Sequence, residues 1–374
     1  MALTTVTGSM ITPSTTLSGD VTVTGTMVMG SSFLRNRIIN GDMRIDQRNA
    51  GASVTITTSN QYTVDRWQGG ATVSSKFSVQ QNAGSVTPPA GFTNYLGCTS
   101  LAATSLGASD YYVVQQKIEG LNIADLGWGT ANARTVTLSF WVRSSLTGTF
   151  GGTIQNSSGG RSYVFTYTIS AANTWEQKSI TITGDTSGTW LTTNGIGMYL
   201  LFSLGVGSTF SGTAGSWSGS NLLSATGATS VVGTNGATFY ITGVQLEIGT
   251  SATPFERRLY GQELANCQRY YAKITSGNPS DAAIIALGVT ITTTNTVGLL
   301  PFRQQMRAVP TLTQSSMIVS DSVSFDATVT AIGGSGTGDG IYLSLIHTAV
   351  AAGRTVNIRA AVSSSGFIAM NAEL

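Results

Sequence analysis

The sequence Val136-Thr137-Leu138-Ser139-Phe140-Trp141-Val142 has an apolar residue at every second position. Successive side chains of a β-strand point to opposite faces, so one face of this strand is wholly apolar. The same alternation recurs in segments that contain Tyr163, Phe165, Tyr167 and Ile169, then Ile180 and Ile182, then Phe239 and Ile241. Clusters of Gly, Asn, Ser and Thr separate these short segments. The pattern predicts an antiparallel β-sandwich, most simply a jelly roll, over residues 36–252.

The composition also favours an all-β protein and excludes several functional classes. The 374 residues include 45 glycines, and charged residues make up 10% of the chain, with 19 Lys and Arg against 17 Asp and Glu. A net charge of +2 gives no reason to expect a nucleic-acid partner. No apolar run approaches the ~18 residues of a membrane-spanning helix. The first residues do not resemble a signal peptide, so we expect folding in a cytosol.

The scarcity of Cys and His argues against metal and triad chemistry. Cys98, Cys267 and His347 are too few for a tetrahedral zinc site unless carboxylates dominate it. We expect two buried thiols rather than a disulfide, and an ordinary histidine at a strand end rather than a triad base. The prediction is therefore a protein without catalytic residues, metal or cofactor.

The first 35 residues are predicted to form an N-terminal β anchor or an oligomer seam. An apolar residue occurs with period two at Val21, Val23, Met27 and Met29. A stretch this short cannot bury its apolar face alone, so we expect it to pack against another copy or another protein. A frayed tail is the alternative.

A connecting helix is predicted over residues 253–274. Thr253, Pro254 and Glu256 have the spacing of a capping box with proline at the first helical position. Four apolar residues then follow at spacings of four, three and four: Tyr260, Leu264, Cys267 and Tyr271. This spacing predicts one apolar helical face. In a trimer, three such stripes can meet at the axis.

Residues 275–374 are predicted to form a C-terminal antiparallel β domain. Val323, Phe325 and Ala327 begin a strand with one buried and one wet face. The glycine-rich stretch 333–340 lacks the Lys-Ser/Thr ending of a phosphate-binding loop, so it reads as a hairpin connection. If this domain is distal, the candidate ligand contacts are Tyr342, His347 and Arg354. The alternative is that residues 333–340 form a mobile tip without a ligand and that Tyr342 belongs to the core.

Two stretches resemble a known family. The first is Asn36-Arg37-Ile38-Ile39-Asn40-Gly41-Asp42-Met43-Arg44-Ile45-Asp46-Gln47-Arg48-Asn49-Ala50-Gly51 with Tyr62-Thr63-Val64-Asp65-Arg66-Trp67. The second runs from Phe239 to Gly249 and on through Ala252-Thr253-Pro254-Phe255-Glu256-Arg257-Arg258 to Cys267-Gln268-Arg269-Tyr270-Tyr271. They are similar to the opening and the ending of a module in fibre proteins of tailed bacteriophages (Caudoviricetes), and they bracket residues 36–272.

This resemblance implies a jelly roll similar to carbohydrate-binding modules, carried by a homotrimeric virion fibre that touches the host surface. It also implies assembly in the host cytoplasm and contact with other virion proteins, which we assign to the N-terminus. No tail-docking domain is recognisable before residue 36.

The leading hypothesis is a non-enzymatic adhesin that binds a host-surface glycan. Sugar sites place an aromatic ring beside hydrogen-bonding side chains, so the candidate residues in the sandwich are Tyr112, Trp128, Trp190 and Trp217. One alternative is a structural virion component such as a head fibre, capsid decoration or collar protein. Another is a polysaccharide hydrolase, which needs two carboxylates such as Asp42 with Asp46 or Glu256 with Glu263.

Overall fold

The computed structural model describes residues 35–57, 59–275, 284–321, 326–337, 339–348, 350–361 and 366–374, all within one compact unit. The predicted seam residues Val21, Val23, Met27 and Met29 lie outside these ranges, as do Val323 and Phe325. The prediction of an N-terminal anchor therefore stays a prediction.

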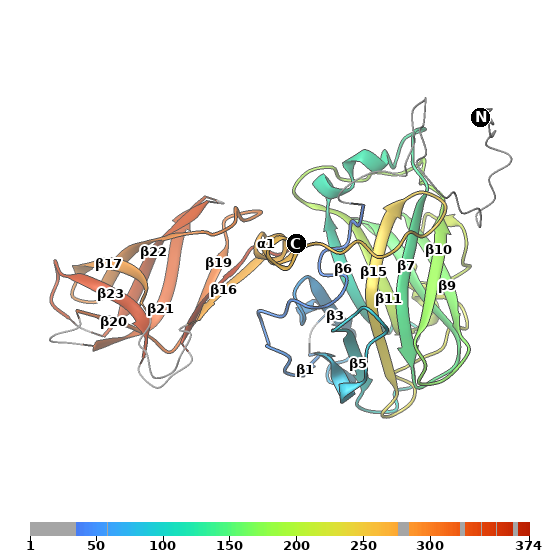
Figure 1. Cartoon of the computed structure of the whole chain (residues 1–374), viewed down its shortest axis with the longest axis horizontal. Coiled ribbons are helices and arrows are strands. Elements are labelled where there is room, and N and C mark those ends of the chain that lie inside the picture. Colours follow the sequence, from blue (N-terminus) through green and yellow to red (C-terminus); the bar gives the residue numbers. More distant parts are fainter. Residues whose placement is uncertain are drawn as a thin grey trace, which may run out of the picture. The chain divides into compact units, whose positions relative to one another are not determined.

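Two antiparallel sheets form a β-sandwich over the first two thirds of the described chain (Figure 1). One sheet has the order β1 (Val54–Thr55), β4 (Phe77–Gln81), β5 (Leu96–Ser100), β15 (Thr238–Ile248), β7 (Val136–Ser144) and β10 (Glu176–Ile182). The other has the order β13 (Trp217–Ser218), β9 (Ser162–Ile169), β8 (Gly148–Asn156), β11 (Ile196–Val206), β6 (Tyr111–Glu119), β3 (Trp67–Ala71) and β2 (Gln61–Tyr62). The chain crosses repeatedly between the sheets, as in a jelly roll.

The alternating residues form the sandwich core as predicted. Val136, Leu138, Phe140 and Val142 of β7 are at most 1% exposed. The connections contain the short 3₁₀ helices η2 (Ala83–Ser85), η3 (Gly120–Asn122), η4 (Ala124–Leu126) and η5 (Ser208–Phe210), and a parallel pair of β12 (Ser211–Gly212) with β14 (Ser224–Ala225). The prediction of an all-β fold with a sandwich is confirmed.

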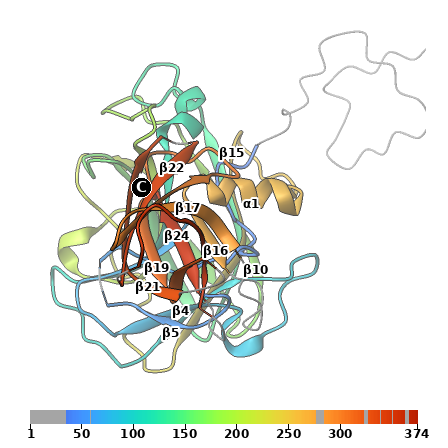
Figure 2. The same ribbon diagram turned by 90° about the vertical axis from the view of Figure 1, so that its left-hand side faces the viewer.

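A second β region follows the sandwich. A small sheet has the order β16 (Tyr271–Thr275), β24 (Phe367–Asn371) and β19 (Thr311–Ser315), seen together in Figure 2. Six strands close an antiparallel barrel in the order β17 (Ile284–Thr292), β18 (Asn295–Pro301), β22 (Gly340–His347), β21 (Asp326–Gly336), β20 (Met317–Ser320) and β23 (Thr355–Ala360). The predicted 333–340 connection is shorter than expected, because β21 continues to Gly336.

A short helix lies between the two β regions, but its predicted extent is wrong at both ends. α1 spans Tyr260–Gln268, and its N-cap, Leu259, makes no side-chain capping bond. The expected capping residues bond to β15 instead: Thr253 donates from its backbone and its hydroxyl to Glu247, and the Glu256 backbone N–H donates to Gln245. Partners in the preceding strand β15 thus outcompete the local capping box.

The predicted apolar stripe does not form one exposed helical face. Cys267 is 1% exposed and packs against Ile39 and Tyr270 of its own chain, whereas Tyr260 is 59% exposed. Leu264 is half-buried in the same cluster, and Tyr271 lies in β16 rather than in the helix. Three of the four side chains therefore pack within the chain.

Three arginines from separate parts of the chain make long-range ion pairs. Arg66, whose side chain is 1% exposed, pairs with Glu373, and Arg48 pairs with the same carboxylate at 2.8 Å. Arg269 is bidentate to the buried Glu119, at 2.6 and 2.9 Å. These pairs tie the residues after β24, and those after α1, to the sandwich.

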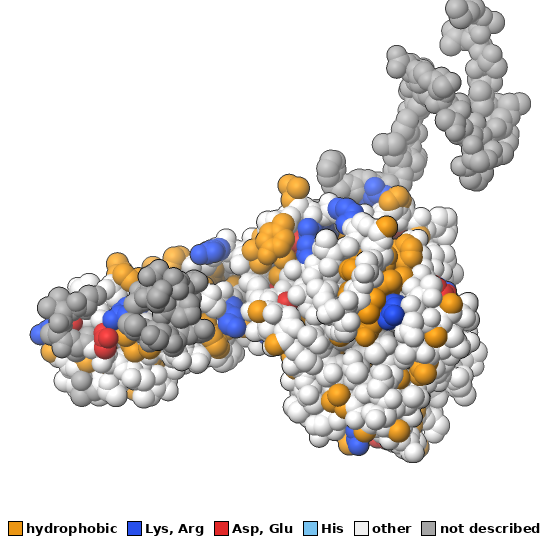
Figure 3. Space-filling view, turned by 60° about the horizontal axis from the view of Figure 1, so that its bottom comes forward, with side chains coloured by type: hydrophobic (Ala, Val, Ile, Leu, Met, Phe, Trp, Pro, Cys, Tyr) orange, Lys and Arg blue, Asp and Glu red, His pale blue; other side chains and the backbone are white. Residues whose placement is uncertain are grey.

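The surface is mostly uncharged. Figure 3 shows few Lys, Arg, Asp or Glu side chains among the white polar groups and backbone, in keeping with the charged fraction of 10%. In the described ranges, no helix has the length and apolar character needed to cross a membrane.

Candidate carbohydrate-binding site

An aromatic pocket lies on the outer face of the six-stranded sheet. It has a volume of about 180 Å³ and is lined by Phe92, Ser139, Trp141, Gln177, Gly243, Thr253, Pro254, Phe255 and Arg257. These residues come from the loop before β5, from β7, β10 and β15, and from the segment before α1. Four parts of the chain that are far apart in sequence thus make one hollow.

Trp141 is one of the residues that line this pocket. It occupies a solvent-side position of β7, because its neighbours Phe140 and Val142 point into the core. The backbone register pairs Trp141 with Gln177 of β10 and with Thr242 of β15. A half-buried indole on the outer face of a sheet offers a ring surface that core packing does not consume.

A bulge in β15 opens the space beside Trp141. The pairing of β15 with β7 shifts register between Thr242 and Gln245, and Gly243 within the bulge has φ of +60°. A Cβ at this glycine would lie 2.6 Å from Phe92 and 3.3 Å from Trp141. The hollow therefore depends on an L side chain being absent at this position.

Two further rings and a cation line one wall of the pocket, beside Gly243 of β15. Phe92 and Phe255 meet edge to face with centroids 5.3 Å apart. The guanidinium of Arg257 lies 4.7 Å from the Phe92 centroid and 5.7 Å from that of Phe255. Glu247 and Gln245 hold this wall in place through the bonds to Thr253 and Glu256 described above. The pocket thus combines aromatic rings with the polar groups of Gln177 and Arg257.

The three tryptophans predicted as sugar contacts form a separate cluster. Trp128, Trp190 and Trp217 have ring centroids 4.7 to 5.6 Å apart and interplanar angles of 80° to 82°. Trp128 and Trp190 are 5% and 7% exposed, and Trp217 is half-buried. Each indole N–H already donates within the chain, to Arg134 O, Asp185 Oδ2 and Thr183 O respectively. Only Trp217 keeps part of its ring at the surface.

An ion pair holds this tryptophan cluster together. Arg161 is bidentate to Asp185, with distances of 2.8 and 2.6 Å, and its guanidinium lies 5.9 Å from the Trp217 ring. Burial disfavours the charge of Asp185, but hydrogen bonds led by Arg161 outweigh it and lower the pKa of that carboxyl. The cluster therefore packs at the edge of the seven-stranded sheet, where β13 pairs with β9.

The remaining predicted contacts lie apart from both sites. Tyr112 is fully buried against Phe77. His347 is 3% exposed and bonds Thr296 at 2.9 Å, and Arg354 pairs with Asp321 at 2.6 Å. Of this group, Tyr342 keeps an exposed ring, at 48%.

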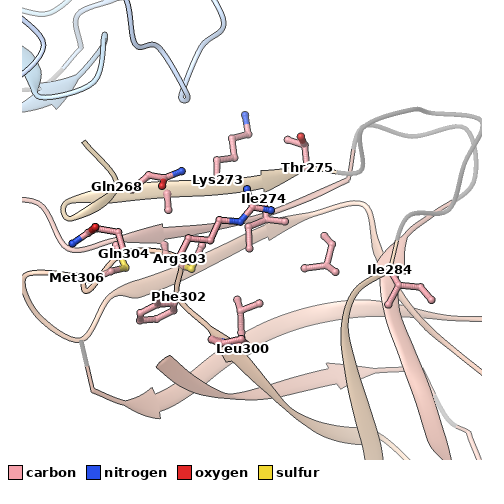
Figure 4. Close-up of a pocket in the computed structure, with 14 residues that line it drawn as sticks. Gln268, Lys273, Ile274, Thr275, Ile284, Leu300, Phe302, Arg303, Gln304 and Met306 are labelled. Carbon is pink, nitrogen blue, oxygen red and sulfur yellow. The ribbon is translucent and has the colours of Figure 1, made fainter. Parts of the chain in front are cut away.

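A larger cavity, of about 470 Å³, lies beside β16 and β18 (Figure 4). Its lining is half apolar, including Ile274, Leu300, Met306 and Met370, and half polar, including Gln268, Lys273 and Gln304, and Arg303 projects across it. It offers one aromatic ring, Phe302. In the described ranges, no group of three or more His, Cys, Asp or Glu is placed to hold a metal ion.

The sequence contained a signal for the aromatic pocket. Trp141 stands out as a tryptophan in the polar phase of an alternating strand, and Phe255 follows directly on Pro254 in the segment read as a helix start. Neither was predicted as a site, because the bulge at Gly243 and the pairing with Gln177 belong to the tertiary structure.

Neither a protein-family model nor a curated protein sequence matches the chain. Among solved structures, a putative sugar-binding protein from Bacteroides thetaiotaomicron matches with a TM-score of 0.34 and 13% identity over 57% of this chain and 100% of its own. The enzymatically active domain of tailspike protein 4 from bacteriophage CBA120 matches with a TM-score of 0.31 and 11% identity, over 57% of this chain and 21% of its own. A family 11 carbohydrate-binding module from Clostridium thermocellum matches with a TM-score of 0.26 and 11% identity, over 54% of this chain and 98% of its own. At these low scores, the functional argument rests on the residues of the pocket.

Proposed function

We propose that this protein is a non-enzymatic adhesin of a bacteriophage virion, a homotrimeric tail fibre that binds a host-surface glycan. The observation that carries the glycan-binding part of this proposal is the Trp141 ring, which lines a pocket together with Gln177 and Arg257. The virion location, the homotrimer and the attachment to other virion proteins through the N-terminus follow from the resemblance to phage fibre modules.

The pocket has the chemistry that a sugar ring requires. A pyranose presents C–H groups on its faces and hydroxyls at its rim, so it suits a flat ring with amide and guanidinium donors around it. The volume of about 180 Å³ fits a single sugar unit rather than a long chain. Binding would therefore be directed at one residue of a surface polysaccharide, and weak for each site.

The carboxylates considered for hydrolysis have structural partners. Glu256 accepts the backbone N–H of Asn36, and Glu263 accepts that of Asn40. Both acids also pair with Arg258. Asp42 pairs with Arg44, and Asp46 accepts the backbone N–H groups of Asn49 and Gly51. These contacts support a role in holding the fold, and with it a protein that binds without cleaving.

The test is binding of the full chain to an array of host-surface glycans and to host cells, with Trp141→Ala and Trp217→Ala as matched variants. We expect Trp141→Ala to weaken binding by at least about tenfold and Trp217→Ala to leave it within about threefold. The reverse result would move the site to the tryptophan cluster. No binding by the wild type would favour a structural virion component, and release of reducing ends would favour a hydrolase.

A further inference from the structure

One side of the C-terminal barrel has an exposed apolar face. Six side chains of β17, β18 and β22 point outward and are 44% to 66% exposed: Leu287, Val289, Ile291, Leu299, Tyr342 and Ile346. They adjoin one another across the strands, since Leu299 pairs with Tyr342, and Val289 pairs with the half-exposed Val297. We call this set the barrel apolar face.

The barrel apolar face carries no charge. The eighteen residues from Ile284 to Pro301 and the eight from Gly340 to His347 contain no Lys, Arg, Asp or Glu. The strand beyond β22, β21, is different, because its Asp326 pairs with Arg359 of β23 at 2.9 Å and its Thr328 points outward. The asymmetry within one barrel indicates that the apolar side is covered.

The face is large for a solvent-exposed surface. With on the order of 100 Å² exposed per side chain, the six side chains present on the order of 600 Å², the upper end of the ~300–600 Å² that the largest apolar patch of a typical monomer covers, and such patches are often functional. A stable interface buries about 800 Å² per partner, so the six side chains and their polar rim come close to that area. The closed barrel has no free strand edge, which leaves side-chain packing rather than strand pairing as the means of contact.

We propose that the barrel apolar face is the surface through which copies of this chain assemble, with a second copy of the chain as its occupant. A surface that meets its own copies must not repel itself, and an uncharged face meets this condition in any symmetric arrangement. The inference rests on the proposed homotrimer but not on sugar binding. It places the contact on β17, β18 and β22, away from the predicted stripe of α1.

The test is sedimentation velocity of the full chain over a range of micromolar concentrations, with Leu299→Glu on the face and Thr328→Glu on the adjoining strand β21, outside the face, as the control. The wild type is expected to be an oligomer, Leu299→Glu to weaken its assembly by roughly 100-fold, and Thr328→Glu to assemble like the wild type. A wild-type monomer would overturn this inference together with the proposed homotrimer. An oligomer that Leu299→Glu leaves intact would overturn the inference alone.

If Leu299→Glu does not fold, the reactivity of a cysteine placed on the face tests the same proposal. Both native cysteines are buried, so Leu299→Cys introduces an accessible thiol at a chosen point of the face. Its reaction with a maleimide should slow as protein concentration rises and copies cover it, whereas Thr328→Cys should react at a constant rate. Equal, concentration-independent rates at both positions would overturn the proposal.

Discussion

Replacing Gly243 by alanine should close the aromatic pocket and destabilise the sandwich. The backbone there has φ of +60°, where an L side chain costs roughly 1–2 kcal/mol. The new Cβ would also lie 2.6 Å from Phe92, closer than real contacts allow, so the Phe92 ring, which lines the pocket, must shift. Overpacking of this kind costs about 1–3 kcal/mol. We therefore expect a loss of about 2–5 kcal/mol in the free energy of unfolding, with loss of glycan binding.

Gly236→Ala is the matched control. This glycine has φ of +73°, but a Cβ there meets nothing within 4 Å. The control should cost about 1–2 kcal/mol for the backbone conformation alone and leave glycan binding unchanged. Urea unfolding followed by tryptophan fluorescence, together with the binding assay, separates the two effects. Equal destabilisation by both substitutions, or wild-type glycan binding by Gly243→Ala, would refute the assignment of the pocket.

Two further predictions concern buried charges. Glu373→Gln should lower the free energy of unfolding by about 3–5 kcal/mol because it leaves the buried Arg66 without its carboxylate, whereas Asp326→Asn, at a half-exposed pair, should cost less than about 1 kcal/mol by the same urea assay. Burial raises the pKa of Asp65 from 3.8 to about 6, so the folded protein binds a proton at this carboxyl more tightly than the unfolded chain does. The stability that this bound proton gives the fold is present below pH 3.8 and is lost as the pH rises through 6. Relative to wild type, Asp65→Asn should thus be about 2.5 kcal/mol more favourable at pH 8 than at pH 4, and a pH-independent difference would contradict this assignment.

The local pattern of the sequence predicted the sheets well. The alternation in Val136–Val142 depends on one strand and its buried face, and the structure buries those four apolar side chains as expected. The capping box at Thr253 failed because Glu247, six residues earlier, holds both its backbone N–H and its hydroxyl. Local spacing cannot show such competition, since the carboxylate is positioned by the pairing of β15 with β7.

The candidate sites depend on tertiary structure to different degrees. Trp128, Trp190 and Trp217 were predicted one by one, and their contact with one another arises because β13 pairs with the edge strand β9. Trp141 gave a signal in the sequence, but the hollow above it requires the bulge at Gly243. The barrel apolar face could not be predicted from the sequence. Its strands show ordinary alternation, and the sequence alone does not say which face of a closed barrel is outside.

The two proposed surfaces depend on each other for adhesion. In the proposed function, a pocket of about 180 Å³ would hold one sugar and bind it weakly in each copy. Copies joined through the barrel apolar face would present several such pockets to one cell surface, and linked sites raise the overall affinity by roughly 10²–10⁴ without any new contact. Leu299→Glu should accordingly retain the affinity of a single pocket for a monosaccharide in solution and yet lose adhesion to host cells. Trp141→Ala should lose both while still assembling. A monomeric Leu299→Glu variant that adheres like the wild type would show that adhesion does not depend on multiple pockets.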